Sequence, residues 1–344
     1  MSKFITGKRV SIVIGILIKI FIVVVIFSVI FAAIRGVNYW RSNIDSNDNY
    51  YLTHNKESFE REVEDAFVAM ISYDELHGFH IKPKEITKKG IIITFGDELN
   101  DCNYERAMEC AANGYEVMSF FYFGKMHQTD YLSEVPLEYF QTILDYAKKN
   151  CTSTDIITVI GSSKGAEMAL LLQNYYPEIT NLVLFSPSSH VFQGLSDEAT
   201  SSWSFKGEPI PFVDFKSSSL LSRGELMSSD LFYTNYSFRS RYSSSLKNSD
   251  NADAAKIKTD NFKGKILLFA GEDDRYWNSA AMAKEIYEDN KDKAQIYTYP
   301  NVGHNFLKGS SLYRYKLGGN YDDNGKAYKN SCEIMLKSLE EWHK

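Results

Sequence analysis

The segment Asp155–Asn174, DIITVIGSSKGAEMALLLQN, constrains the fold of this chain more than any other. It opens with a short β-branched apolar run, Asp155–Ile160, that is typical of a buried strand. Ala and Leu then recur at helical spacing. Between strand and helix lies a G-x-S-x-G turn, Gly161–Gly165, whose glycines let strand and helix approach closely and whose central serine is Ser163. The segment therefore predicts a nucleophile elbow, and a plain Ser/Gly turn is the alternative.

From Phe79 onward, predicted strands and helices alternate, as they do in a mainly parallel sheet with helices on both faces. The candidate strands are Phe79–Ile81, Gly90–Phe95, Tyr115–Phe121, Asp155–Ile160, Asn181–Phe185, Lys265–Ala270 and Gln295–Tyr299. The candidate helices are Tyr104–Ala112, Leu137–Lys149, Lys164–Tyr175, Ser279–Asp289 and Ser331–His343. The runs GIIITF and KILLFA do not alternate, which indicates strands buried on both faces.

Residues 189–261 interrupt this alternation and are rich in Ser, Tyr, Phe and Asn. We interpret them as a partly helical cap over the catalytic edge of the sheet, with a disordered surface excursion as the alternative. The cap is dense in aromatic residues, which we expect to line an apolar acyl pocket unless they form the cap's own small core. They are Trp203, Phe205, Phe212, Phe215, Phe232, Tyr233, Tyr236, Phe238 and Tyr242.

A serine nucleophile needs a base to take its proton and an acid to orient that base. In an α/β-hydrolase the acid and then the histidine follow the serine, on loops after late strands. The strand Lys265–Ala270 is followed by Gly271-Glu272-Asp273-Asp274, and the strand Gln295–Tyr299 by a loop that ends in His304. The order and positions predict a Ser163–Asp274–His304 triad in an α/β-hydrolase fold.

Three further assignments complete the predicted site. Asp273 competes for the role of acid, but the G-x-x-D spacing from the strand end favours Asp274 and leaves Asp273 to cap or pair nearby. The oxyanion hole is expected to use the backbone N–H of Lys164 and, after the strand GIIITF, that of Asp97. His190 follows the Asn181–Phe185 strand and is interpreted as a cap or pocket residue.

Composition narrows the classes of partner. The net charge is −6 and the isoelectric point near 5.7, which argues against nucleic acid. The four cysteines lack C-x-x-C spacing and suggest neither a zinc site nor a disulfide scaffold. His77 and His80 form an H-x-x-H pair without a third ligand, more typical of a surface pair than of a metal site. We therefore predict chemistry with no metal and no cofactor; the sequence carries no signal for an oligomeric state.

The N-terminal segment Val10–Ile34 is apolar except for Lys19 and long enough to cross a bilayer. A cleaved signal peptide is the alternative, but Phe31-Ala32-Ala33 is a poor cleavage site. The slight excess of Lys and Arg before the segment favours residues 1–9 in the cytoplasm and the folded domain outside. Residues 36–56 are expected to be a linker and residues 57–344 the hydrolase domain, which begins with an amphipathic helix over Ser58–Met70.

Several motifs resemble the C-terminal catalytic domain shared by acyl-CoA thioesterases and bile acid-CoA:amino acid N-acyltransferase (BAAT). They are GSSKGAE at the elbow, EDDRYWNS at the acid loop, YPNVGH at the histidine, and the intervening PLEYF and FKGEPIPF. The resemblance covers the chain from about Gly90 onward. It implies that Asp274 is the catalytic acid and His304 the catalytic histidine, as the strand positions also predict. The acyltransferase has a cysteine nucleophile, so Ser163 points to hydrolysis. The segment Gly36–Lys89 is too short for the β-sandwich domain that precedes the catalytic domain in animal members.

The sequence therefore predicts a membrane-tethered serine hydrolase of the thioesterase or esterase type. Its substrate is expected to be a small-molecule acyl ester or thioester, cleaved through an acyl-enzyme. A membrane-tethered, non-catalytic binding protein on the same fold is the alternative from another class, although it has no reason to keep a complete Ser, Asp and His set. The same residues would also suit an acyltransferase that uses an amine as acceptor, or a peptidase.

Overall fold

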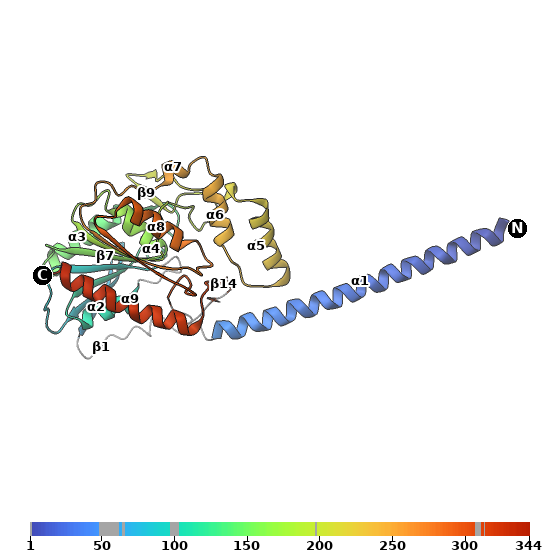
Figure 1. The fold of residues 1–344 in the computed structure, drawn as a ribbon, viewed down its shortest axis with the longest axis horizontal. Coiled ribbons are helices and arrows are strands. Elements are labelled where there is room, and N and C mark those ends of the chain that lie inside the picture. The colour runs from blue at the N-terminus through green and yellow to red at the C-terminus, as the bar shows by residue number, and fades with distance from the viewer. Residues whose placement is uncertain are drawn as a thin grey trace.

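A computed structural model describes residues 2–47, 62–63, 66–96, 103–196, 198–306, 311–312 and 314–344. One long N-terminal helix, α1 (Ser2–Asn47), projects away from a layered α/β domain (Figure 1). The domain is built around one large sheet, and the termini lie at opposite ends of the molecule (Figure 1).

The described residues form a nine-stranded sheet in the order β1-β2-β3-β5-β4-β7-β8-β11-β12. Its strands are β1 (Glu62–Val63), β2 (Ala66–Tyr73), β3 (Leu76–Pro83), β4 (Ile91–Phe95), β5 (Glu116–Phe121), β7 (Ile157–Ser162), β8 (Ile179–Phe185), β11 (Lys265–Gly271) and β12 (Ala294–Tyr299). The first three strands and β5 pair antiparallel, and the strands from β5 to β12 pair parallel.

Helices cover both faces of this sheet because successive residues of the central strands face opposite sides. They are α2 (Tyr104–Ala112), α3 (Tyr139–Asn150), α4 (Lys164–Leu172), α8 (Ser279–Asp289) and α9 (Tyr321–Trp342). In β4, Ile91 and Ile93 join the core cluster that contains α3, α4 and α8, while Ile92 joins the cluster that contains α2 and α9. The predicted sheet with helices on both faces is confirmed.

Two of the predicted elements were wrong, the helix over Ser58–Met70 and the start of the last helix. The helix predicted over Ser58–Met70 is replaced, in the described residues, by the strands β1 and β2. β2 pairs with β3 along its whole length, and Phe67 and Met70 are exposed, so their helical spacing did not report a buried face. The linker predicted over 36–56 is helical to Asn47, and residues 48–56 lie outside the described residues. Helix α9 begins ten residues earlier than predicted, because the Asn320 side chain caps it by accepting from the Asp323 N–H.

The insertion over residues 189–261 is partly helical, as expected. Its elements are β9 (Trp203–Phe205), β10 (Glu208–Pro209), a 3-10 helix (Phe215–Ser217), α5 (Leu220–Phe232), α6 (Arg239–Asn248) and α7 (Ala252–Ala255). β9 pairs with β10 and with β6 (Val135–Pro136), while β13 (Ser311–Leu312) and β14 (Tyr315–Lys316) form a separate ribbon.

The aromatic residues of the insertion are mostly used for packing. Trp203 is buried in the main core, and Phe215 and Tyr242 are buried in a third cluster with Tyr276 and Trp277 of the acid loop. These three rings therefore pack in the main core and against the acid loop.

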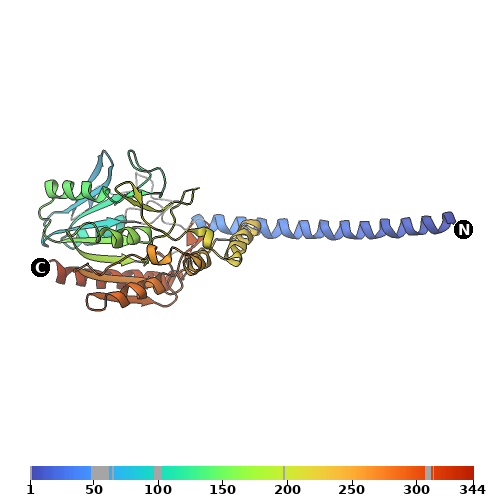
Figure 2. The same cartoon turned by 90° about the horizontal axis from the view of Figure 1, so that it is seen from above.

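Helix α1 stands outside the core. Its segment Ile12–Arg41 is long and apolar enough to cross a membrane, and none of its most apolar window is buried by the rest of the chain. A core helix of a soluble domain would be mostly buried. Near its end α1 contacts α5, where the rings of Phe31 and Phe232 lie 5.6 Å apart (Figure 2).

Candidate active site

The G-x-S-x-G turn has the geometry of a nucleophile elbow. Ser163 lies between β7 and α4 with φ 53° and ψ −118°, a conformation that costs about 1–3 kcal/mol for a residue with a side chain. A Cβ on Gly161 would come within 2.3 Å of the Gly165 carbonyl oxygen, and one on Gly165 within 2.1 Å of the Gly96 carbonyl oxygen. Only glycine fits at both positions, so the strand, the helix and the loop after β4 meet tightly around Ser163.

The three residues predicted as a triad lie in one hydrogen-bonded chain. His304 Nε2 is 2.6 Å from Ser163 Oγ, and His304 Nδ1 is 2.8 Å from Asp274 Oδ2. The other carboxylate oxygen of Asp274 accepts the backbone N–H groups of Tyr276 at 2.9 Å and Trp277 at 3.1 Å. Because a carboxylate accepts, Nδ1 carries the proton that faces Asp274, and Nε2 is left to accept the serine proton.

Asp273, the competing acid, faces elsewhere. Its carboxylate pairs with Arg275 at 2.6 Å and accepts the Gly319 N–H at 3.0 Å. It thus ties the acid loop to the segment before α9. The pairing role expected for Asp273 matches its position.

His304 is held by the loops around it. Its backbone N–H donates to Leu317 at 2.9 Å, and its carbonyl oxygen accepts the Ser186 hydroxyl. The ring centroids of Tyr276 and Trp277 lie 4.9 and 5.3 Å from the imidazole centroid. Ser163, Asp274 and His304 are all buried, so their polar contacts are strong and shielded from water.

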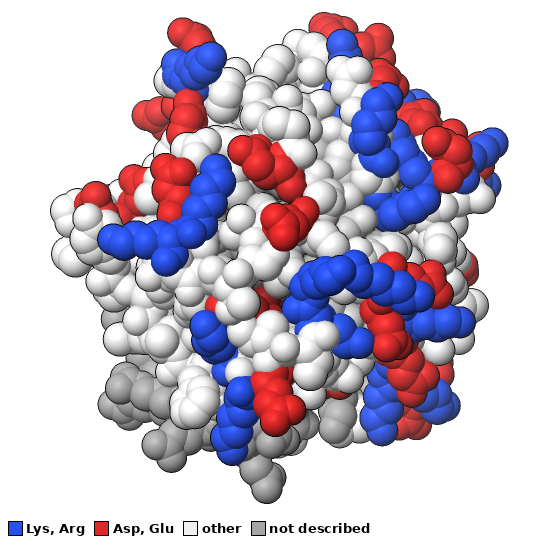
Figure 3. All heavy atoms as spheres, turned by 90° about the vertical axis from the view of Figure 1, so that its left-hand side faces the viewer, with Lys and Arg blue, Asp and Glu red and all other residues white. Residues whose placement is uncertain are grey.

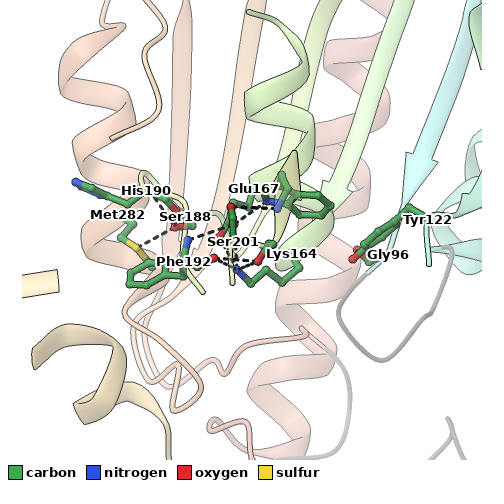
Figure 4. Close-up of polar contacts among 11 residues, drawn as sticks. Gly96, Tyr122, Lys164, Glu167, Ser188, His190, Phe192, Ser201 and Met282 are labelled. Carbon is green, nitrogen blue, oxygen red and sulfur yellow. Dashed lines mark hydrogen bonds and ion pairs between the residues drawn. The ribbon is translucent and has the colours of Figure 1, made fainter. Parts of the chain in front are cut away.

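The predicted oxyanion donors are only partly described. Lys164 is the first residue of α4, directly after Ser163, so its backbone N–H lies at a helix amino terminus. Asp97 lies outside the described residues. Beside it, the carbonyl oxygen of Gly96 accepts the Tyr122 hydroxyl at 3.3 Å, which anchors the start of that loop (Figure 4).

The Lys164 side chain has a partner that the sequence reasoning missed. Its ammonium lies 3.0 Å from both carboxylate oxygens of Glu167, and both side chains are fully buried (Figure 4). Glu167 Oε1 also accepts from the indole of Trp203 at 2.8 Å, and the Lys164 ammonium donates to Ser202 Oγ at 2.9 Å. The i, i+3 spacing of Lys and Glu in the first turn of the helix was the available signal.

A second polar cluster, formed by residues other than those of the triad, lies at β3 and β5. His80 Nε2 is 2.8 Å from Glu116 Oε1 and 3.8 Å from Cys151 Sγ. Burial raises the pKa of Glu116, but hydrogen bonds from His80 and Thr152 outweigh it and lower the pKa to about 2. The His80, Glu116 and Cys151 donor atoms lie within 4.8 Å of one another, a grouping that the H-x-x-H interpretation of His77 and His80 missed. Glu116 is already paired, since Lys82 also lies 3.6 Å away, and we interpret the cluster as structural.

His190 is buried in the insertion, where its Nδ1 lies 2.9 Å from the Ser189 hydroxyl. A cavity of about 510 Å³ lies beside Tyr122, Val135 and Tyr139, and its lining includes none of the three triad residues.

Comparison with known proteins matches residues 135–307 to the family described as "BAAT / Acyl-CoA thioester hydrolase C terminal". Human acyl-coenzyme A thioesterase 6 is 25% identical over 230 residues, which are 65% of this chain and 50% of that protein. Mouse mitochondrial acyl-coenzyme A thioesterase 2 is 27% identical over 220 residues, 62% of this chain and 44% of that protein. The chain thus spans about half the length of the curated relatives it matches.

Solved structures agree on the fold. An esterase of Pyrococcus furiosus has a TM-score of 0.50 at 14% identity, covering 81% of this chain and 92% of its own. Carboxyl esterase 2 of Tuber melanosporum has a TM-score of 0.51 at 12% identity, covering 82% and 90%. At such identities the likeness concerns the α/β-hydrolase fold alone.

Proposed function

The chain belongs to the family of BAAT and acyl-CoA thioester hydrolase C-terminal domains, and on that premise we propose that it is a serine hydrolase that cleaves an acyl ester or thioester. The observation that carries the proposal is the hydrogen-bonded chain from Ser163 through His304 to Asp274, at a strained elbow. The relatives named as acyl-coenzyme A thioesterases support a thioester or ester carbonyl as the target.

In the proposed reaction Ser163 Oγ attacks the acyl carbonyl carbon while His304 Nε2 takes its proton. Asp274 holds the Nδ1–H and stabilises the imidazolium that forms. The tetrahedral intermediate collapses, and His304 returns the proton to the leaving thiolate or alkoxide. Water then attacks the acyl-enzyme in the same way and releases the carboxylic acid. His304 accepts and returns each proton that is transferred in these steps.

The oxyanion of each tetrahedral intermediate needs donors that are in place before charge develops. We assign one donor to the backbone N–H of Lys164, at the amino terminus of α4. The second is assigned to Asp97 in the loop after β4, whose backbone approaches the elbow at Gly96 and Gly165. A serine rather than a cysteine at the elbow favours water as the acyl acceptor over an amine.

We also propose that the hydrolase, residues 57–344, is tethered by α1 as an uncleaved anchor and lies outside the cytoplasm. The apolar segment Ile12–Arg41 supports the anchor, since it is unburied and exceeds the roughly 20 residues that a bilayer needs. Phe31, which borders the position where a signal peptidase would cut, also packs against Phe232 of the domain.

A fluorophosphonate probe tests the nucleophile, because it phosphonylates only a serine activated by a base. We expect the full-length chain to be labelled and Ser163→Ala to be unlabelled. Ser162→Ala is the matched control, since Ser162 is the neighbouring serine and its hydroxyl accepts from Asn103 instead of contacting His304. A folded wild-type chain that stays unlabelled would contradict the hydrolase proposal. Labelling that survives Ser163→Ala would contradict the assignment of the nucleophile.

A further inference from the structure

Helix α5 exposes four large apolar side chains, beside the charged Arg223, Glu225 and Asp230, which is unusual for a helix on the surface of a soluble domain. Leu220 is 83% exposed, Leu221 88%, Met227 72% and Leu231 53%. Its buried side instead carries serines: the Ser222 hydroxyl lies 3.1 Å from that of Ser244 in α6. A surface helix normally buries its apolar side chains and exposes its polar ones. An outward apolar face of this kind marks an interaction surface.

The position of α5 indicates what that surface meets. The Arg35 guanidinium of α1 donates to the carbonyl oxygens of Asp230 at 3.1 Å and Leu231 at 2.8 Å. Asn38 of α1 donates to the Phe232 carbonyl oxygen at 2.8 Å. These acceptors lie at the carboxyl end of α5, where helix carbonyl groups lack intrahelical partners and favour a cation. The end of α5 is therefore fixed to α1.

The contacting residues of α1 lie where its apolar run ends. The run closes at Ile34, so Arg35 and Asn38 fall at the level where a membrane-spanning α1 leaves the hydrocarbon. Figures 1 and 2 both show α5 at the end of the domain from which α1 projects, and in Figure 1 it runs across the direction of α1. On the opposite side of the domain, Lys, Arg, Asp and Glu are scattered among other residues (Figure 3), as expected of a face in water.

We propose that α5 lies in the headgroup region of the bilayer that α1 crosses, with Leu220, Leu221, Met227 and Leu231 directed to the acyl chains. A helix that lies in this plane with its apolar face in the lipid is a known mode of membrane contact. The inference goes beyond the hydrolase reaction and rests on α1 as the anchor.

The contact joins the membrane to the active site through one further helix. Ser219 and Ser222 of α5 are hydrogen-bonded to Ser244 of α6. At the start of α6, the Arg239 guanidinium donates to the carbonyl oxygens of Glu272 at 3.0 Å and Asp274 at 2.7 Å. Helix α5 and the acid loop of the triad are thus linked through α6.

The test uses the full-length chain in phosphatidylcholine vesicles, with a cysteine introduced by Leu221→Cys or Met227→Cys and carrying an environment-sensitive fluorophore. Two quenchers are compared, a doxyl group on lipid acyl chains and iodide in water. We expect doxyl lipid to quench both α5 labels, and iodide to quench them less than a label at Glu341→Cys near the C-terminus. The unsubstituted chain measures the background from native cysteines.

A label at Val23→Cys in α1 separates this inference from the anchor. If doxyl lipid quenches Val23→Cys but leaves the α5 labels as accessible to iodide as Glu341→Cys, the anchor stands and the inference is overturned. If the α5 labels are shielded from iodide without quenching by doxyl lipid, a protein surface covers α5, and the inference is again overturned. If the Val23→Cys label escapes doxyl lipid as well, the anchor and the inference fall together.

Discussion

In the first turn of α4, after the proposed nucleophile Ser163, Lys164 and Glu167 form an ion pair with no access to solvent. Burial raises the pKa of the Glu167 carboxyl, and the Lys164 ammonium opposes that shift. The pair is satisfied on all sides, because Trp203 and the backbone N–H of Phe192 also donate to Glu167 Oε1. These donors come from the insertion. The pair therefore fastens the first turn of the elbow helix to the segment that covers it.

Removing one member of this pair should destabilise the fold strongly. We expect Glu167→Gln to lower the free energy of unfolding by about 3–5 kcal/mol, because it leaves a buried ammonium uncompensated. The double variant Lys164→Met/Glu167→Gln should recover part of that loss. Thermal or urea unfolding of the detergent-solubilised chain measures both.

The matched control is Glu288→Gln, which removes an exposed i, i+3 partner of Lys291. Its effect should be much smaller than that of Glu167→Gln, as for exposed pairs in general. Similar losses for Glu167→Gln and Glu288→Gln would contradict the role given to the buried pair.

The two neighbouring aspartates should separate in their kinetics. Asp274→Asn is expected to lower kcat about 10⁴-fold, since the imidazole loses the acceptor that fixes its tautomer. Asp273→Asn removes the pair with Arg275 and should change stability more than kcat. Hydrolysis of a p-nitrophenyl ester measures kcat for both. If Asp273→Asn were the inactive variant, the acid would have to be reassigned.

At the scale of single elements, the sequence was most informative where periodicity and end signals coincide. The bounds of α2 and α8 were predicted to the residue, and Asp274 and His304 could be chosen because each follows a predictable strand. The strand β2 was misread, because beyond Ala66 and Phe67, which pair with β1, its residues pair only with β3, and its burial does not follow strict alternation. Its pairing with β3 depends on contacts that a local pattern does not contain.

The buried polar contacts of Glu167 and Glu116 could not be predicted from the sequence for a related reason. Lys164 and Glu167 meet Ser202 and Trp203, residues more than thirty positions later, only because β9 lies against α4. Glu116 similarly meets His80 through the antiparallel pairing of β3 with β5. Such contacts depend on the order of strands in the sheet, which no spacing in the chain reveals.

The Glu116 cluster joins β3, β5 and the end of α3 through His80, Glu116 and Cys151. Its contribution to the stability of the fold should therefore depend on pH. The pKa of Glu116 is about 2 in the folded chain, below its usual 4.5, so the carboxylate stabilises the fold at neutral pH. That contribution, at most about 3 kcal/mol, should be lost as the pH falls from about 4.5 toward 2. Glu116→Gln should be less stable than wild type at pH 7 and approach it in acid, as followed by urea unfolding between pH 2 and 7. A difference independent of pH would contradict this linkage.

At the scale of the whole molecule, the proposed anchor raises the question of which compartment the candidate active site faces, which the direction of α1 in the membrane would decide. Lys3, Lys8 and Arg9 precede the apolar run, and only Arg35 and Arg41 follow it closely. Positive residues near a membrane helix favour the cytoplasmic side. Arg35 is in addition engaged by the carbonyl groups of α5, so part of its charge is already satisfied on the side of the domain.

We therefore expect the domain to lie outside the cytoplasm and α1 to stay attached. A reporter that is active only outside the cytoplasm should give signal when fused after Lys344, and a reporter active only in the cytoplasm should not. The intact chain should remain in the membrane fraction after a high-salt wash, because an apolar helix resists salt while an electrostatic attachment does not. Exchanging Lys3, Lys8 and Arg9 for Gln removes the charge bias and should raise the inverted fraction. A soluble product that begins near Ala33 would instead identify the segment as a cleaved signal, and would remove Phe31 from its contact with α5.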